Sequence, residues 1–356
     1  MPTKSPTSVR FAMWRVGLHD LLHRKRRFVI AVLATAIAFG LALLLSGVLE
    51  HLKRENQRVV SMFGADAFVV AEGGTGPFST TQLIPQDTVE AVRASPGVVK
   101  ATAFAQVRDV LKDKDANVLG IEPGGLGWPT KVDGRLAEQP GEVVVDTSLG
   151  YDIGDEIMLG GEPSTVVGRS HDTTYYFGQP TAFLPLADVQ ARFLGGLPLA
   201  TAVAVQGDPT PPPSGTTVYD PGEALADLNR PQEAGNQTIQ IISMLLWIMA
   251  AGVVASMLYL SVIERTTELA TCKAMGVGTF TLFSALALQG LLLALVACGV
   301  GVLVALALAP IFPFPVEIPA AAYITAVVAA IVVGLVASLI GLRRTTRVDP
   351  ALAFGG

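Results

Sequence analysis

Four long apolar stretches divide the chain into membrane-spanning and water-exposed parts. They cover residues 28–49, 238–263, 280–310 and 320–342. Each reaches the roughly 20 residues, at ~1.5 Å rise per residue, that a ~30 Å hydrocarbon core requires. None carries an unpaired charge near its centre, whereas a soluble core helix of this length would show a polar face at every turn. The pattern therefore predicts a membrane α-helical protein with four transmembrane helices.

The polar segment 50–237, between the first and second spans, predicts one large folded domain. The first helix is expected to continue as a stalk through Glu50–Phe63, because no helix breaker occurs before Gly64. Short strand and helix patterns follow, which is typical of an α+β domain. A small β-subdomain is expected at about residues 134–185, and a later strand should return to the main sheet. The expected strands are 67–71, 98–107, 117–121, 142–145, 156–159, 164–167, 181–184 and 201–205, and the expected helices are 85–94, 186–193 and 222–229.

The charge distribution predicts the orientation in the membrane. The net charge of −5 hides an excess of basic residues before residue 28 and after residue 342, and an excess of acidic residues within 50–237. Basic residues beside spans stay in the cytoplasm. Both termini and the loop 264–279 are therefore expected inside, and the large domain and the short loop 311–319 outside. The multi-pass chain is accordingly placed in the plasma membrane, with an amphipathic helix within residues 1–27 along the inner leaflet.

The cytoplasmic loop 264–279 is predicted to hold a short amphipathic helix. Leu269, Cys272 and Gly276 fall at i, i+3 and i+7, on one narrow face, and Thr271 lies opposite. A solvated turn between two spans would need no such face. Two interpretations stay open at this point: a surface on which another protein docks, or a turn without a function.

The same loop resembles the signature loop of the FtsX/MacB-like (type VII) ABC transporter permeases. The resemblance is carried by Glu264-Arg265, Glu268-Leu269 and Lys273-Ala274-Met275-Gly276, and by Asp349-Pro350 after the last span. It extends over the whole chain, which is most like the four-span permeases of actinobacteria. It implies that the loop is the coupling helix seated in a groove of the cytoplasmic ATPase. The coupling residues implied are Glu264, Arg265, Glu268, Leu269, Cys272, Lys273, Gly276, Asp349 and Pro350.

The outer segment is similar to the periplasmic region of MacB-like permeases at three places, Gly134-Arg135, Glu142–Val145 and Gly154-Asp155. The family resemblance implies two copies of the chain with two ATPase subunits, which bind ATP and Mg. It implies that ATP hydrolysis moves the outer domain and that an amphipathic or hydrophobic substrate (lipid, lipopeptide, drug or heme) is exported or extracted. The alternative is an FtsX-like signalling permease that transports nothing and regulates an extracytoplasmic cell-wall hydrolase.

Motifs for chemistry in the chain itself are missing from the sequence. No Walker A motif occurs, so ATP hydrolysis is assigned to a separate subunit, and no Cys/His cluster has zinc spacing. His19 and His23 stand at i, i+4 without a third ligand nearby. We therefore expect neither an enzyme nor a cofactor or metal site, and nothing predicts a nucleic-acid partner. The expected partners are the ATPase, a second copy, membrane lipids and, as a candidate, an extracytoplasmic protein.

Two groups of residues are candidates for substrate or partner contact. The outer group has a simpler interpretation, as aromatic residues that cover the β-subdomain, and the membrane group has one as packing against lipid or helices. The candidates are His171, Tyr175 and Tyr176 in the outer domain, and Met249, Met257 and Tyr259 in the second span.

A stripe of small residues on the first span is the candidate dimer interface. Ala34, Ala38 and Ala42 follow one another at i, i+4 and i+8, a spacing that suits close helix packing in a membrane. The alternative is that the stripe faces lipid or the chain's own helices.

Overall fold

The computed structural model describes residues 25–176, 178–264, 271, 278–312 and 316–346. The chain forms two compact units, a helical unit of residues 1–51 and 237–356 and an outer unit of residues 52–236. The outer unit has nearly the bounds of the domain expected at 50–237.

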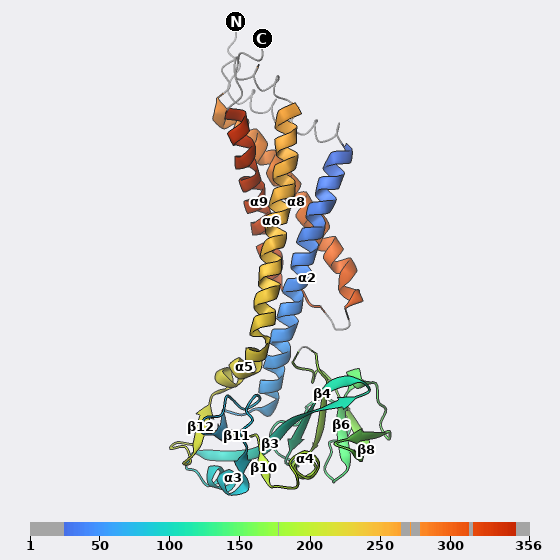
Figure 1. Cartoon of the computed structure of the whole chain (residues 1–356), viewed down its shortest axis with the longest axis vertical. Helices are drawn as coiled ribbons and strands as arrows, with labels where there is room; N and C mark the ends of the chain where they lie inside the picture. The colour runs from blue at the N-terminus through green and yellow to red at the C-terminus, as the bar shows by residue number, and fades with distance from the viewer. Residues whose placement is uncertain (1–24, 177, 265–270, 272–277, 313–315, 347–356) are drawn as a thin grey trace. The chain divides into compact units, whose positions relative to one another are not determined.

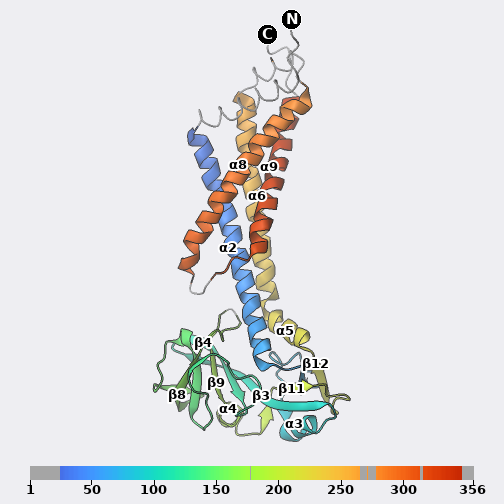
Figure 2. The same ribbon diagram turned by 180° about the vertical axis from the view of Figure 1, so that it is seen from behind.

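The helical unit contains four long helices, each long and apolar enough to cross a membrane. They are α2 (Lys25–Phe63), α6 (Glu233–Glu264), α8 (Thr279–Leu308) and α9 (Ala320–Thr346) (Figures 1 and 2). The structure thus places a helix at every predicted span. As expected, α2 runs on to Phe63, and the chain then turns at Gly64, whose φ of 54° suits glycine.

Small residues let these helices approach closely. A Cβ atom added to Gly40 of α2 would lie 2.9 Å from the carbonyl oxygen of Gly301 in α8. A Cβ atom on Gly290 of α8 would lie 2.9 Å from the carbonyl oxygen of Gly334 in α9. Since lipid offers helices no hydrophobic drive to associate, such backbone proximity supplies much of the packing.

The outer unit is built on one ten-stranded sheet with the order β12-β1-β11-β3-β4-β9-β6-β8-β5, in which β7 pairs with β8. Only the pairs β4–β9 and β6–β8 are parallel among its described pairs. A separate two-stranded sheet joins β10 and β2. The strands are β1 (Ala67–Ala71), β2 (Ile84–Pro85), β3 (Val98–Leu111), β4 (Lys114–Ile121), β5 (Val132–Gly134), β6 (Glu142–Asp146), β7 (Glu156–Leu159), β8 (Glu162–Ser170), β9 (Thr181–Pro185), β10 (Leu199–Ala200), β11 (Ala202–Gly207) and β12 (Thr216–Tyr219).

The topology confirms one expectation and changes another. β11 returns to the main sheet between β1 and β3, as the sequence predicts. The strands of the expected β-subdomain are continuous with that sheet, because β9 pairs with both β4 and β6. Four short strands, β2, β5, β10 and β12, have no counterpart among the predicted elements.

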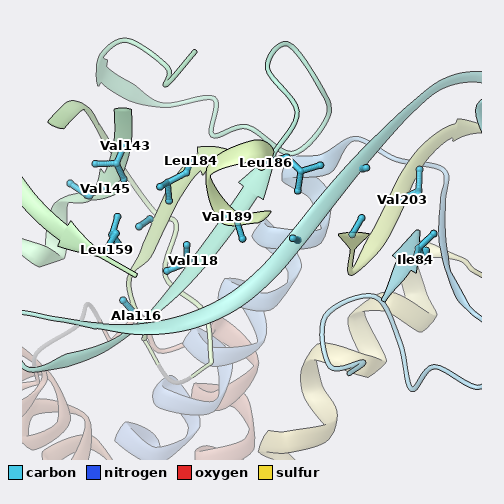
Figure 3. Close-up of a cluster of buried hydrophobic side chains, with 14 of the residues drawn as sticks. Ile84, Ala116, Val118, Val143, Val145, Leu159, Leu184, Leu186, Val189 and Val203 are labelled. Atoms are coloured by element: carbon cyan, nitrogen blue, oxygen red, sulfur yellow. The ribbon is translucent and has the colours of Figure 1, made fainter. Parts of the chain in front are cut away.

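The two faces of the sheet carry separate apolar cores, because successive side chains of a strand point to opposite sides. Helices α3 (Gln86–Arg93) and α4 (Leu186–Phe193) cover one face. Figure 3 labels ten buried residues of that core: Ile84, Ala116, Val118, Val143, Val145, Leu159, Leu184, Leu186, Val189 and Val203.

The other face is covered by the end of α2 and by α5 (Pro221–Asn229). Its core is rich in aromatic rings. Phe63 of α2 lies with its ring centroid 4.7 Å from that of Phe104 in β3 and 5.6 Å from that of Phe68 in β1. The outer part of α2, residues 52–63, is therefore built into the outer unit.

Candidate functional site

The predicted coupling loop lies almost entirely outside the described residues. Helix α6 ends at Glu264 and α8 begins at Thr279. Glu264 is exposed at the end of α6, and Thr271 is an exposed helical residue. The other predicted coupling residues fall outside the described part of the chain: Arg265, Glu268, Leu269, Cys272, Lys273, Gly276, Asp349 and Pro350.

Helices α2 and α6 each contribute residues to both compact units. α2 has 39 residues and α6 has 32. At 1.5 Å per residue they are about 58 and 48 Å long, well beyond a ~30 Å hydrocarbon core. The boundaries between the units fall after His51 and before Gln237, inside these helices. Two unbroken helices thus join the units, and α6 ends where the predicted coupling loop begins.

The small-residue stripe on α2 is largely used within the chain. Ala38 and Ala42 are each 1% exposed, and Ala38 belongs to a core formed by all four long helices. Ala34 is partly exposed. This burial favours the alternative interpretation, packing against the chain's own helices, for Ala38 and Ala42.

The membrane contact residues are spread along α6. Met249 and Tyr259 are 48% and 38% exposed, whereas Met257 packs against the helical core. Ten positions along a helix span about 15 Å. Met249 and Tyr259 therefore cannot form one compact site on a single helix, although both face outward.

The outer contact residues separate into an accessible histidine and two buried tyrosines. His171 is exposed, and its Nε2 lies 2.9 Å from Asp133 Oδ2. Tyr175 and Tyr176 are 1% and 4% exposed, with ring centroids 5.0 Å apart. Burial raises the pKa of the Tyr175 hydroxyl well above its usual value and that of Tyr176 to about 12. Both tyrosines belong to the aromatic core, as the simpler interpretation expects, and His171 alone stays available to a partner.

A buried carboxylate that the sequence did not single out organises the aromatic face. Asp227 of α5 is fully buried and accepts hydrogen bonds from the backbone N–H groups of Phe78 (2.9 Å) and Ser79 (3.1 Å) and from the Ser79 hydroxyl. Arg230 Nη1 lies 3.9 Å from its Oδ1 atom. Its hydrogen-bonding partners lie far away in the sequence, so no local pattern indicates this role.

An exposed ion pair at the start of β6 shows a large electrostatic effect. The Arg135 guanidinium is paired with the Glu142 carboxylate, which also accepts from the backbone N–H groups of Glu138 and Gln139. The hydrogen bond from Arg135 lowers the pKa of Glu142 to about 2. The pair closes the turn before β6 and has no reacting group beside it.

Among the described residues, no group of three or more His, Cys, Asp or Glu side chains could hold a metal ion. The described cysteine, Cys298, is buried in α8.

Comparison with known proteins gives a consistent assignment. The model of the FtsX-like permease C-terminal family matches residues 240–350, and that of the MacB-like periplasmic core domain matches residues 28–214. The chain is 37% identical to the ABC transporter permease Rv2563 of Mycobacterium tuberculosis (strain ATCC 25618 / H37Rv), over 96% of this chain and 99% of the relative. It is 38% identical to the permease Rv0072 of the same strain over the same shares.

More distant similarities cover most or part of the chain. A Staphylococcus haemolyticus (strain JCSC1435) protein, HrtB, whose name is that of a hemin transport system permease, is 21% identical over 93% of this chain and 96% of its own. The solved periplasmic region of MacB from Actinobacillus actinomycetemcomitans covers 45% of this chain and 91% of its own, with 15% identity and a TM-score of 0.33.

The whole-length identity to ABC permeases agrees with the four spans and the α+β outer unit. The chain belongs to the FtsX/MacB-like family of ABC transporter permeases, multi-pass membrane subunits that work with a separate ATPase subunit.

Proposed function

We propose that two copies of this permease and two cytoplasmic ATPase subunits form a complex that moves an amphipathic or hydrophobic substrate from the outer leaflet or the external space. ATP hydrolysis would act on the loop 264–276, and α6 and α2 would pass the movement to the outer unit. The termini lie in the cytoplasm in this arrangement, as the basic flanks of the spans predict.

The observation that carries the proposal is the continuity of α6. One helix extends from Glu233, in the outer unit, to Glu264, where the coupling loop begins. A force applied at the cytoplasmic end of a continuous helix is transmitted along its backbone hydrogen bonds, whereas a flexible linker would absorb it. The second connection, α2, is also an unbroken helix.

The composition of the helical unit supports the substrate class. Its buried polar side chains, among the described residues, are Thr35, His51, Gln289 and Ser338, and none of them is an Asp, Glu, Lys or Arg. Paths for ions and polar solutes in membranes are usually marked by buried ionisable residues. His51, the ionisable residue in this group, lies beyond the span predicted at 28–49. The exposed methionine and aromatic side chains of α6 suit an apolar partner, and the likeness to HrtB makes heme one such substrate.

The coupling role is tested by a charge placed on the predicted docking face. Leu269→Asp would put a carboxylate into an apolar groove contact, where desolvation without a partner costs several kcal/mol. Co-purification of the ATPase should fall at least about tenfold, since ~1.4 kcal/mol is a factor of ten in affinity. Thr271→Asp is the matched control, with the same charge on the opposite, exposed side of the predicted helix. Full ATPase binding and activity in Leu269→Asp would show that the loop is only a turn.

The substrate class is tested with the assembled complex in lipid nanodiscs. ATP hydrolysis should rise with hemin, a lipopeptide or an added lipid, and the rise should disappear in Leu269→Asp. A response to a cell-wall hydrolase alone, with no response to any amphipathic compound, would instead identify a signalling permease.

A further inference from the structure

The segment 171–176, which follows β8 and leads toward β9, contacts the outer part of α2 at two places. Thr174 Oγ1 donates a hydrogen bond to Glu55 Oε1. Farther along α2, Arg58 Nη1 lies 3.5 Å from Asp172 Oδ1. Glu55 and Arg58 are separated by three positions, so they share one face of the helix. Two polar side chains of the segment, Asp172 and Thr174, thus contact one face of α2.

The same segment is fixed to the sheet through Thr173, which is 5% exposed. Its backbone N–H donates to Asp146 Oδ2 at 3.2 Å, and its hydroxyl lies 2.7 Å from both Asp146 Oδ2 and Ser170 Oγ. The hydroxyl of Thr181 donates to the carbonyl oxygen of Thr173. Asp146 ends β6, Ser170 ends β8 and Thr181 begins β9. The segment cannot shift against these three strands without breaking buried hydrogen bonds, which is costly.

The backbone of the segment is held in an unusual shape. Asp172 and Tyr176 have φ angles of 60° and 51°, in the left-handed region that non-glycine residues avoid. The Tyr176 ring lies 5.0 Å from the Arg108 guanidinium carbon, and its hydroxyl donates to the carbonyl oxygen of Phe78 at 3.2 Å. Such conformations persist only where the surroundings fix them, and they are concentrated at functional positions.

A neighbouring residue of α2 contacts a different element. Asn56 Nδ2 donates to Asn229 Oδ1 at 2.8 Å and lies 3.3 Å from Gln232 Oε1. These partners lie at the end of α5 and in the short turn that precedes α6. The outer part of α2 therefore makes polar contacts in two directions, toward α5 and toward the segment 171–176.

We propose that the segment 171–176 transmits movement of α2 to the β6–β8–β9 part of the sheet. The inference rests on the proposed function, which supplies the movement of α2. The segment is suited to this role because it contacts side chains of α2 and is hydrogen-bonded, through Thr173, to three strands. The hydrogen bonds of Asn56 go instead to Leu228, Asn229 and Gln232, at the end of α5 and in the turn before α6.

The experiment measures movement of α2 and of the sheet separately in the complete complex. Single cysteines carrying spin labels are placed at Gln57, an exposed residue of α2, or at Met158, a 59% exposed residue of β7, which pairs with β8. The native Cys272 and Cys298 are replaced by Ser and Ala. Pulsed electron paramagnetic resonance then gives the distance between the two spin labels, one on each copy. It is measured without nucleotide and with ATP hydrolysis trapped by vanadate.

In the unaltered permease the distance should change at both labels on ATP trapping. In Thr174→Val combined with Arg58→Met, the change at Gln57 should persist and the change at Met158 should be lost. Asn56→Ala is the matched control and should leave the distance change at Met158 intact. Thr174→Ser, which keeps the hydroxyl, should also show the distance change at Met158. If the double variant does not fold, Arg58→Met alone gives the same comparison, because that side chain is 41% exposed.

The outcomes separate the two proposals. An unchanged shift at Met158 in the Thr174→Val/Arg58→Met variant overturns the transmission role, and so does an equal loss in Asn56→Ala. No shift at Gln57 in the unaltered complex overturns the proposed function itself.

Discussion

Replacing Asp227 by alanine should destabilise the outer unit strongly. The change removes the acceptor of three hydrogen bonds, from the backbone N–H groups of Phe78 and Ser79 and from the Ser79 hydroxyl. Phe78 is buried, so its N–H group would be left without water or protein as a partner, at a cost of about 1–3 kcal/mol. Ser79 is partly exposed and water can replace its lost bonds, so about 1 kcal/mol each is expected there.

These losses sum to about 3–5 kcal/mol, a large part of the 5–15 kcal/mol that typically stabilises a domain. Asp227→Asn keeps the shape and one acceptor oxygen, so about 1–2 kcal/mol should be lost. Arg230→Gln is the control. Arg230 has a half-exposed side chain whose Nη1 lies 3.9 Å from Asp227 Oδ1, beyond hydrogen-bond distance, so this variant should lose about 1 kcal/mol or less.

The assay is urea unfolding of the full chain in detergent, followed by the fluorescence of Trp128. That residue belongs to the same aromatic core as Phe78. Trp14→Phe and Trp247→Phe remove the other two tryptophans of the chain. A loss of free energy of unfolding in Asp227→Ala below about 1 kcal/mol, or no larger than in Arg230→Gln, would refute the reasoning.

Three further outcomes are expected. A cysteine at Val99, which is 84% exposed, should react with a membrane-impermeant thiol reagent in intact cells, and one at Thr346 should not; the reverse pattern would overturn the orientation. Gly290→Val should weaken helix packing and lower thermal stability, because its Cβ atom would lie 2.8–2.9 Å from atoms of α9. Gly252→Val, with open space around it, should be tolerated, and equal stability of the two variants would contradict this. The pKa of Glu142 is lowered to about 2, so its contribution to stability should be present above pH ~4.5 and lost as the pH falls toward 2. In Glu142→Gln, the free energy of urea unfolding should therefore fall less between pH ~4.5 and pH ~2 than in the unaltered protein. An unchanged pH dependence would exclude the Arg135–Glu142 pair as the cause of that fall.

The position of the Val99 cysteine shows what the fold adds to a sequence-based design. By its place in the segment expected outside the membrane, Thr173 near His171 would suit an outer label as well as Val99, yet Thr173 is 5% exposed and hydrogen-bonded to Asp146. Polar character along the chain does not say whether a side chain is hydrogen-bonded inside the domain. Only the tertiary contacts separate exposed His171 from its buried neighbours.

The sequence by itself determined the four spans, the length of α2 and most of the strands and helices. These depend on local properties: apolar length, the absence of a helix breaker before Gly64, and the period of apolar positions. These properties depend on residues close together in the sequence, so the elements can be predicted from them without knowledge of the tertiary structure. The resemblance of the coupling loop to the family was also carried by one short stretch.

The tertiary structure alone decided which apolar and polar groups meet. β5 and β12 are too short to show a period, and each is defined by a strand distant in the sequence, β8 or β1. A small-residue stripe at Ala38 and Ala42 indicates close packing, but only the fold shows that the chain's own helices cover it. Hydrogen bonds such as that of Asp227 with Phe78 join residues far apart in the chain, and a local sequence pattern cannot predict such a pairing. Periodicity identifies the face of an element that is buried, and the neighbour that buries it is set by the packing of the whole unit.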